Sequence, residues 1–265
     1  MIEVVISGAG GRLGRRILAA AATDPALRVA GALVRAGSPL DGRPLGELSS
    51  APIEGRATGD LAVIRPDTVL LIAAPRTAAL EQAARAAELG APALIATTGF
   101  EAKERAALEA HAARIPLIIA PNLSPGIAVL TELVRRASAA LRDYDLELVE
   151  IHHNKKKDAP SGTAWALARA GAEARGQDIE RDALLARGGE TGVRGKAEIG
   201  IQALRGGDVI GEHTVYLFGP TERLELKHRA ESRDVFAAGA IAAAKFLGAV
   251  GRRSGLYTMR DVLGL

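Results

Sequence analysis

The sequence predicts an α/β protein in which a doubly wound parallel sheet is followed by a second, strand-rich domain. Two observations predict this class. Short runs of β-branched and aliphatic residues alternate with Ala- and Leu-rich segments from Ile2 to Ala120, which is the pattern of a parallel sheet with connecting helices. After Asn122 the alternation gives way, and the stretch from Glu198 to His228 is rich in strand-forming residues.

The first part opens with a strand, a glycine turn and a helix. Each later strand is a short apolar run bounded by proline or glycine, and each helix is an Ala-rich run between such breaks. The expected strands are residues 2–6, 27–34, 68–73, 93–96 and 116–120, and the expected helices are 15–22, 77–89 and 101–114.

The second part begins with a helix at 126–141 that leads into a strand at 145–151, a loop and another helix. The strand-rich stretch turns at Gly206-Gly207-Asp208 and at Gly219-Pro220, both of which are turn-forming combinations. A last helix at 235–246 is rich in Ala. We expect a dinucleotide-binding domain over residues 1–123 and 241–265, and a second domain over residues 124–240.

Composition limits the class of protein. Hydrophobic residues at 48% and charged residues at 25% are ordinary for a soluble globular chain. A net charge of +3 over 265 residues, without a basic stripe, gives little reason to expect nucleic acid and suits a small anionic ligand. The chain has no Cys, which excludes disulfides and thiolate chemistry. We expect no signal peptide, because the N-terminal residues have no basic region and lead directly into a strand. No apolar run approaches the roughly 20 residues of a membrane span, so we expect a cytoplasmic protein.

The glycine turn after the first strand has glycines at positions 8, 10, 11 and 14. The common G-x-G-x-x-G spacing fails at Leu13, but G-x-x-G-x-x-G fits. Glycines in such a turn let backbone N–H groups approach a pyrophosphate at the positive end of the next helix. A tight strand–helix turn without a ligand is the alternative. The preceding strand, the following helix and the N-terminal position favour a dinucleotide.

The end of the second strand predicts which dinucleotide is bound. NAD-selective sites usually carry an acid here, for the ribose 2′-hydroxyl. This strand ends at Val34-Arg35, and no acid lies between Asp24 and Asp41. Arg35 can contact a 2′-phosphate, with Arg12 and Arg16 as helpers; a solvated strand end is the alternative. The sequence therefore predicts NADPH in preference to NADH.

The stretch EIHHNKKKDAPSGTA (150–164) concentrates titratable and cationic residues. His152 and His153 follow a strand, and neighbours on a strand point to opposite faces, so we expect different tasks for them. They lack the spacing of metal ligands. Ser161 or Thr163 can cap the next helix, whose first N–H groups suit a carboxylate. The stretch predicts an anion-binding loop with general-acid candidates; a solvated lysine loop and a surface His pair are the alternatives.

The whole chain closely resembles the dihydrodipicolinate reductases, also called 4-hydroxy-tetrahydrodipicolinate reductases, of bacterial lysine and diaminopimelate biosynthesis. The resemblance runs from Val4 to Leu265, and its most specific motif is 152–164. The segments that carry it are GAGGRLG (8–14), TTGF (97–100), PNLS (121–124), HHNKKKDAPSGTA (152–164), IGIQALRGGDVIGEHTV (199–215) and SGLYTMRDVL (254–263).

The resemblance implies a fold, a reaction and an assembly. It implies an N-terminal Rossmann domain and a C-terminal α+β domain with a mixed or antiparallel sheet, which binds substrate and forms a homotetramer. It also implies NAD(P)H as the cofactor. Hydride goes to ring atom C4 of a small dicarboxylate, with overall loss of the 4-hydroxyl as water.

The resemblance also implies individual roles. On the family pattern His152 is the catalytic acid/base and Lys156 the proton donor, whereas Lys155 and Lys157 fall where other residues are accepted. The substrate-binding residues are His153, Ser161, Gly162 and Thr163. The cofactor-binding residues are Gly8, Ala9, Gly10, Gly11, Arg12, Leu13, Arg35, Ala96, Thr97, Thr98, Ala120, Pro121, Asn122 and Leu123, with Arg233 and Phe236 as further candidates.

Four departures from the family pattern stand near the expected nicotinamide pocket or the domain junction. Residues 72–74 are Ile-Ala-Ala where many members have Asp-Phe-Thr or Asp-Phe-Ser, and Ala96, Leu123 and Ala128 replace Gly, Phe and Asn. They leave two alternatives: a reductase repurposed for another imine or carbonyl acid, and a catalytically idle NADPH-binding homologue. Retention of His152, Lys156 and the 162–163 pair argues against the idle form.

Overall fold

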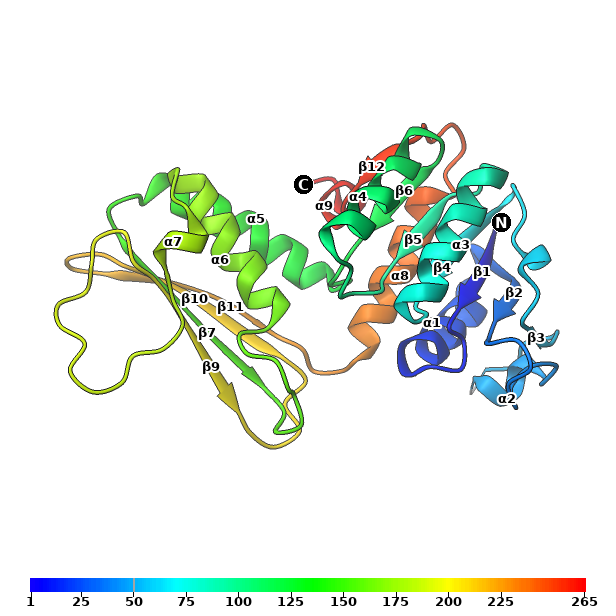
Figure 1. Cartoon of the computed structure of the whole chain (residues 1–265), viewed down its shortest axis with the longest axis horizontal. Coiled ribbons are helices and arrows are strands. Elements are labelled where there is room, and N and C mark those ends of the chain that lie inside the picture. Colours follow the sequence, from blue (N-terminus) through cyan, green and yellow to red (C-terminus); the bar gives the residue numbers. More distant parts are fainter. Residues whose placement is uncertain (50) are drawn as a thin grey trace. The chain divides into compact units, whose positions relative to one another are not determined.

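The computed structural model describes residues 1–49 and 51–265, and the chain folds into two compact units (Figure 1). The first unit comprises residues 1–125 and 234–264, and the second comprises 126–233 and 265. Helix α8, Asp234–Leu247, lies wholly in the first unit. The chain therefore returns to the first unit at residue 234, earlier than the expected residue 241.

The first unit contains a seven-stranded sheet with the order β12-β6-β5-β4-β1-β2-β3, and every strand pair in it is parallel. The order reverses at β1, which has β2 on one side and β4 on the other. Ligands of open parallel sheets bind at such a switch point, outside the carboxyl ends of the strands. The strands are β1 Ile2–Ser7, β2 Leu27–Leu33, β3 Ala57–Thr58, β4 Thr68–Ile72, β5 Ala93–Ile95, β6 Pro116–Ile119 and β12 Gly255–Tyr257.

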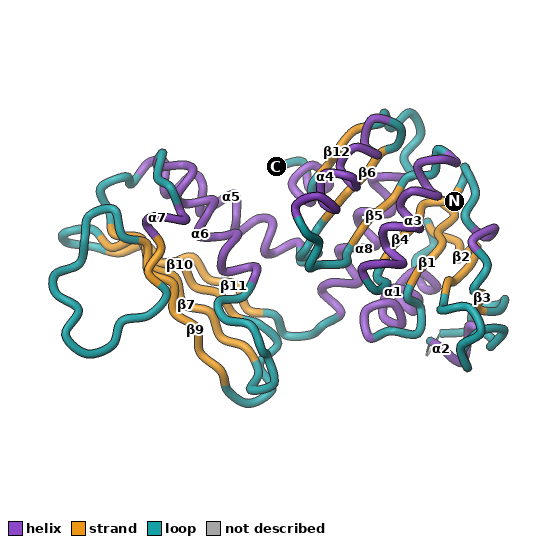
Figure 2. Tube along the Cα trace, viewed as in Figure 1, coloured by secondary structure: helices purple, strands orange, loops and turns teal. Residues whose placement is uncertain are grey.

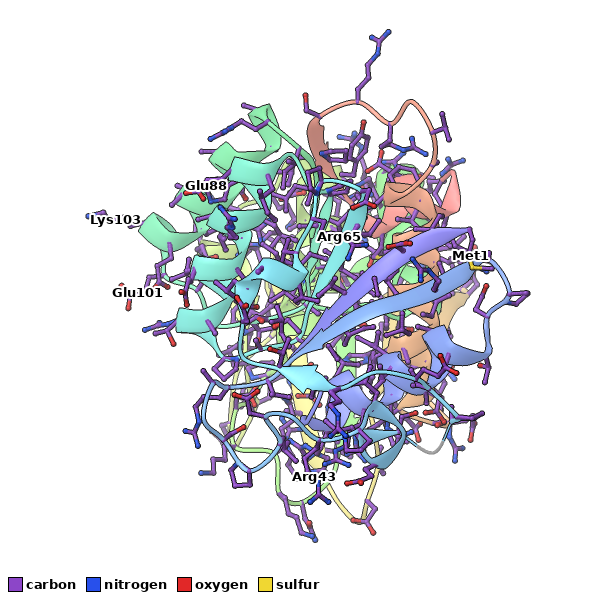
Figure 3. All side chains as sticks on the ribbon, turned by 90° about the vertical axis from the view of Figure 1, so that its right-hand side faces the viewer. Met1, Arg43, Arg65, Glu88, Glu101 and Lys103 are labelled. Atoms are coloured by element: carbon purple, nitrogen blue, oxygen red, sulfur yellow. The ribbon has the colours of Figure 1, made fainter. Side chains whose placement is uncertain are left out.

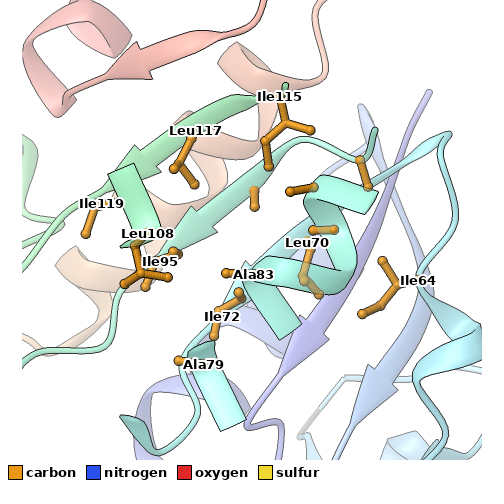
Figure 4. Close-up of a cluster of buried hydrophobic side chains, with 14 of the residues drawn as sticks. Ile64, Leu70, Ile72, Ala79, Ala83, Ile95, Leu108, Ile115, Leu117 and Ile119 are labelled. Carbon is orange, nitrogen blue, oxygen red and sulfur yellow. The ribbon is translucent and has the colours of Figure 1, made fainter. Parts of the chain in front are cut away.

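Helices cover this sheet, and a core of small and branched side chains joins the two. The central strands are buried along their whole length, as parallel strands covered on both faces must be. Alanines of α3 let that helix approach the sheet closely (Figure 4), which explains a core with few aromatics. The helices of this unit are α1 Arg12–Thr23, α2 Leu45–Leu48, α3 Arg76–Leu89, α4 Ala102–Ala110, α8 and α9 Met259–Leu263.

Two sequence predictions need adjustment here. The expected helix 101–114 ends at Ala110 and continues as a short 3-10 helix, His111–Ala113. The helix after the glycine turn begins earlier than expected, at Arg12, so that its first turn is part of the turn motif.

Charged side chains of α3 and α4, such as Glu88 and Lys103, project from the unit (Figure 3). Among the described residues, no helix has the length and apolarity that a membrane span requires.

The second unit contains a five-stranded sheet with the order β11-β10-β7-β9-β8. Strands β10 and β11 run antiparallel to their neighbours, and β7, β8 and β9 pair in parallel, so the sheet is mixed, as the resemblance implied. Helices α5 and α6 pack over one face of it (Figure 2). The elements are α5 Pro125–Ala140, β7 Asp145–His152, α6 Gly162–Arg175, α7 Ile179–Asp182, β8 Ala183–Leu184, β9 Ile199–Arg205, β10 Glu212–Phe218 and β11 Arg223–Arg229.

Strand β7 is central in this sheet and ends at the catalytic candidate His152. Its residues are buried in alternation: Leu146, Leu148 and Glu150 face the helices. A carboxylate thus occupies a position where the period of two predicts an apolar side chain.

Candidate active site

The glycine turn between β1 and α1 is closely packed. Gly8 adopts a positive φ of 75°, and a Cβ on it would overlap the carbonyl oxygen of Ala73. A Cβ on Gly14 would overlap the carbonyl oxygen of Gly8. These positions require glycine because the backbone of β1, the residues after β4 and the first turn of α1 are in contact there.

The start of α1 is suited to an anion. Its N-cap is Gly11, which has no side chain that could accept a hydrogen bond from the helix start. The described residues of its first turn include no Asp or Glu. The first N–H groups of a helix have no partner within the helix and carry partial positive charge. This backbone arrangement fits the pyrophosphate of a dinucleotide.

The loop after β2 carries Arg35 and packs on the glycine turn. A Cβ on Gly10 would overlap the side chain of Leu40, so the two segments touch. The carboxylate of Asp41 accepts hydrogen bonds from the N–H groups of Gly37 (2.9 Å) and Gly59 (3.1 Å). This first acid after β2 therefore holds the loop closed with both of its oxygens.

The arginines near this loop differ in their partners. Arg35 is exposed, and within the described residues its guanidinium has no hydrogen bond or ion pair. Arg12 is also exposed. Arg16, considered as a helper for a 2′-phosphate, pairs with Asp234 at the start of α8. Of the three arginines, Arg16 is thus the one already neutralised by a carboxylate.

The remaining cofactor candidates follow the carboxyl ends of β5 and β6, which lie on the β4 side of the switch point at β1. The hydroxyl of Thr97 donates to the carbonyl oxygen of Ala74 at 2.7 Å, and Ala120 N–H donates to Ile95 at 3.0 Å. Thr98 and Pro121 are exposed, and Leu123 is buried. The sheet therefore brings the 96–98 and 120–123 segments to the same edge as the glycine turn.

Two of the four family departures have a packing role in the first unit. Ala73 is the residue whose carbonyl lies against Gly8, and the carbonyl of Leu123 lies where a Cβ on Gly239 of α8 would be. Phe236 lies in the first turn of α8, and Arg233 is the residue immediately before that helix, at the end of the 126–233 segment of the second unit.

In the second unit, the centre of the site is the pair formed by Glu150 and His152. Glu150 is 0% exposed, and its Oε2 lies 2.6 Å from Nδ1 of His152. Arg205, at the end of β9, donates to both carboxylate oxygens of Glu150, at 2.8 Å each. The acid/base candidate is therefore held by a buried carboxylate that is itself neutralised by a guanidinium.

Lys156 lies in the loop that follows β7. Its Nζ is within 2.9 Å of both carboxylate oxygens of Asp158, and its side chain is 19% exposed. Lys155 and Lys157 are exposed, as expected for the lysines that do not match the family position. His153 is partly buried, and its buried Nδ1 has no hydrogen-bond partner among the residues that the structure describes.

Ser161 is the N-cap of α6 and is buried. Its hydroxyl oxygen accepts from Ala164 N–H at 3.2 Å and lies 3.1 Å from Nε2 of His213. Its own N–H donates to Glu150 at 3.0 Å. The hydroxyl and the N–H of Ser161 are thus both hydrogen-bonded within the protein. The next two residues, exposed Gly162 and partly buried Thr163, begin the helix.

Neighbouring charges and burial set the protonation of this cluster. Burial alone would raise the pKa of Glu150, but Arg205, His152 and the Ser161 N–H hold it below its usual value. Burial lowers the pKa of His152, and the positive charges of Lys156 and Arg205 add to this, outweighing the attraction of Glu150. Burial, more than any neighbour, lowers the pKa of His213 to about 4.

Three residues of this cluster were not identified from the sequence: Glu150, Arg205 and His213. The ring of His213 meets that of His152 edge-on, with centroids 5.3 Å apart. The sequence does contain a signal for Glu150, because Leu146, Leu148 and Glu150 alternate along the strand and therefore share its buried face. Arg205 and His213 are placed by pairing of β9 and β10 with β7, which no local pattern gives.

The arrangement as a whole can bind anions and move protons. The first unit offers a dinucleotide turn, and the second offers an imidazole, an ammonium group and a helix start within one loop. Among the described residues, no group of three or more His, Asp or Glu side chains is placed to hold a metal ion. These residues are suited to general acid/base chemistry beside an anionic group.

Comparison with known proteins gives a consistent family. Models described as "Dihydrodipicolinate reductase, N-terminus" and "Dihydrodipicolinate reductase, C-terminus" match residues 2–123 and 126–263. A 4-hydroxy-tetrahydrodipicolinate reductase of Anaeromyxobacter sp. (strain Fw109-5) is 46% identical over 268 residues, spanning 100% of this chain and 98% of that protein. One from Desulfotalea psychrophila is 44% identical, spanning 100% and 99%.

Solved structures show the same fold. A dipicolinate-bound dihydrodipicolinate reductase from Paenisporosarcina sp. TG-14 has a TM-score of 0.76 at 21% identity, covering 98% of both chains. A diaminopimelate (DAP) dehydrogenase of C. glutamicum, solved with DAP, has a TM-score of 0.54 at 17% identity, covering 97% of this chain and 92% of that one. The fold is thus shared with dehydrogenases of other specificity.

Proposed function

The chain belongs to the dihydrodipicolinate reductase family, and from this premise we propose that it reduces 4-hydroxy-tetrahydrodipicolinate to tetrahydrodipicolinate, with loss of the 4-hydroxyl as water. The reaction serves lysine and diaminopimelate biosynthesis. The observation that carries this proposal is the buried Glu150–His152 pair, with Lys156 in the adjoining loop and the start of α6 beyond it.

The proposed roles follow from these positions. His152 is the acid/base, because its ring is partly buried and one nitrogen is already held by a carboxylate. Lys156 is the proton donor. Gly162 and Thr163 hold one substrate carboxylate at the start of α6, and His153, partly buried at the start of the same loop, binds the substrate. Ser161 supports them as the helix cap.

We further propose NADPH as the preferred cofactor. When bound, the reduced nicotinamide supplies the hydride. The 8–13 turn and the start of α1 hold the pyrophosphate, Arg35 contacts the 2′-phosphate, and the 96–98 and 120–123 segments lie toward the nicotinamide end. The exposed guanidinium of Arg35 and the engagement of Asp41 within its own loop support NADPH, because neither offers an acceptor to a ribose 2′-hydroxyl.

The first test is turnover of each reduced cofactor, with substrate generated in the assay from pyruvate and aspartate semialdehyde. We expect faster oxidation of NADPH than of NADH. Arg35→Ala should raise KM for NADPH by about 10-fold or more, the effect of losing a charged hydrogen bond, and leave KM for NADH unchanged. Arg16→Ala is the control, since that guanidinium is paired with Asp234.

A second test addresses the acid/base residues. His152→Ala and Lys156→Ala should each lower kcat by about 10² or more, the scale of general acid catalysis, with NADPH affinity unchanged. Normal kcat in both variants would contradict the roles. Bound NADPH without turnover of this substrate in the unmodified protein would favour the repurposed or idle homologue, and the Ile72-Ala73-Ala74 segment would then be the first to exchange.

We also propose that the protein works in the cytoplasm as a homotetramer, as the resemblance implies. Exposed apolar side chains on three strands of the second sheet support assembly through this unit: Leu204, Phe218 and Leu224. Light scattering of the purified protein tests the assembly, and a monomeric mass would contradict it.

A further inference from the structure

Among the described residues of the second unit, the most buried charged residue is Glu150, and nothing in the proposed reaction requires it to touch substrate. A buried carboxylate is costly unless it is paired and hydrogen-bonded. Glu150 meets that condition through three partners: the Arg205 guanidinium, Nδ1 of His152 and the N–H of Ser161. These partners come from β9, from β7 itself and from the start of α6.

The contact with His152 determines where that imidazole carries its proton. Glu150 is ionised, because Arg205, His152 and the Ser161 N–H keep its pKa low, and an ionised carboxylate only accepts hydrogen bonds. Nδ1 of His152 must therefore carry a hydrogen. Nε2 is left as the nitrogen that can exchange a proton with a ligand.

Glycine at position 211 leaves space beside Nε2, because a Cβ there would lie 3.0 Å from that nitrogen, closer than side chains are usually tolerated. The other titratable and charged groups facing the His152 ring are Glu150 on its own strand, Arg205 on β9, His213 on β10 and Lys156 in the loop.

We propose that Glu150 is a positioning residue that holds His152 in the Nδ1-protonated tautomer and joins the acid/base ring to the helix start that binds the substrate carboxylate. This inference rests on the proposed role of His152. The second link is the hydrogen bond from Ser161 N–H, which fixes α6 to the same carboxylate. In this proposal one side chain fixes which nitrogen of His152 exchanges the proton. It also fixes where that nitrogen lies relative to the substrate carboxylate at the start of α6.

The experiment compares Glu150→Gln with Glu147→Gln. Glu147 is a matched control, because it lies on the same strand and pairs with the two arginines Arg187 and Arg194 but does not contact a histidine. We expect Glu150→Gln to lower kcat by about 10- to 100-fold, with KM for NADPH unchanged, and to lower the pKa of His152 read from the pH profile. Glu147→Gln should keep both kcat and the profile.

A direct readout is ring ¹⁵N NMR of His152 in the unmodified protein, assigned with His152→Gln. We expect Nδ1–H in the unmodified protein and a shift toward Nε2–H in Glu150→Gln. An Nε2–H tautomer in the unmodified protein would overturn the proposal whether or not Glu150→Gln folds, as would an unchanged pH profile in a folded Glu150→Gln. Because the tautomer is measured without turnover, this failure is distinct from a failure of the proposed reaction.

Discussion

Acid should weaken the second unit through one buried histidine. His213 is 3% exposed, and burial lowers its pKa from 6.5 to about 4. Between pH 6.5 and about pH 4, His213 is protonated in the unfolded chain but neutral in the folded chain. The free energy of unfolding therefore falls as the pH falls. A pKa difference of this size corresponds to a total loss of about 3 kcal/mol in the free energy of unfolding, at about 1.4 kcal/mol per pH unit. About 2 kcal/mol of this loss has occurred by about pH 5.

The chain provides its own probe for this measurement. Trp165 is its one tryptophan and lies in α6, packed on the core of the second unit. Urea unfolding followed by Trp165 fluorescence should give a lower free energy of unfolding at about pH 5 than at about pH 7. His213→Gln keeps a hydrogen-bonding group near Ser161 but cannot titrate, so the loss should shrink by about 2 kcal/mol.

His228, opposite His213 on β11, is the control, because burial lowers its pKa too but it is more exposed. His228→Gln should leave most of the acid sensitivity in place. Equal acid sensitivity in the unmodified protein and in His213→Gln would refute the reasoning.

Three further predictions concern other parts of the chain. Lys155→Ala should keep kcat within about twofold, in contrast to Lys156→Ala, when both are assayed at saturating NADPH; equal losses would mean that the loop acts only by its total charge. Gly14→Ala should abolish NADPH binding measured by fluorescence titration, because its Cβ would overlap the Gly8 carbonyl, and binding at normal affinity would contradict that packing. Arg187→Ala should lower Tm without changing kcat, because Arg187 pairs with Glu147 and Glu198 away from His152; a fall in kcat at unchanged Tm would show that this ion network reaches the site.

The fold of the first unit could be read from the sequence because its signals are local. The central strands there are mostly apolar runs bounded by proline or glycine, and each long helix has its own apolar pattern. The short elements β3, β8 and β12 could not be found this way, since two or three residues carry no period. They exist because a neighbouring strand offers them a hydrogen-bonded edge.

The candidate site also combines residues that the sequence predicts with residues that it does not. His152, Lys156 and the 161–163 segment are contiguous, so one motif contains them. Arg205 lies 55 residues from Glu150 along the chain, and β7 and β9 bring the two together by a parallel pairing that ends at His152 and Arg205. Local sequence patterns do not predict that pairing. They do place the acid Glu150 on the buried face of β7, where a carboxylate needs a cationic partner.

The two proposed anion sites both use the start of a helix, but in different ways. Helix α1 begins at a glycine without a side-chain cap, so its first N–H groups remain for the two phosphates of a dinucleotide. Helix α6 begins at Ser161, whose hydroxyl takes the N–H of Ala164 while its own N–H goes to Glu150. We propose that the helix start at Gly162 and Thr163 holds a single carboxylate. The capped helix start suits a small ligand that must be held in one orientation beside His152, whereas the uncapped start suits a larger and more highly charged one.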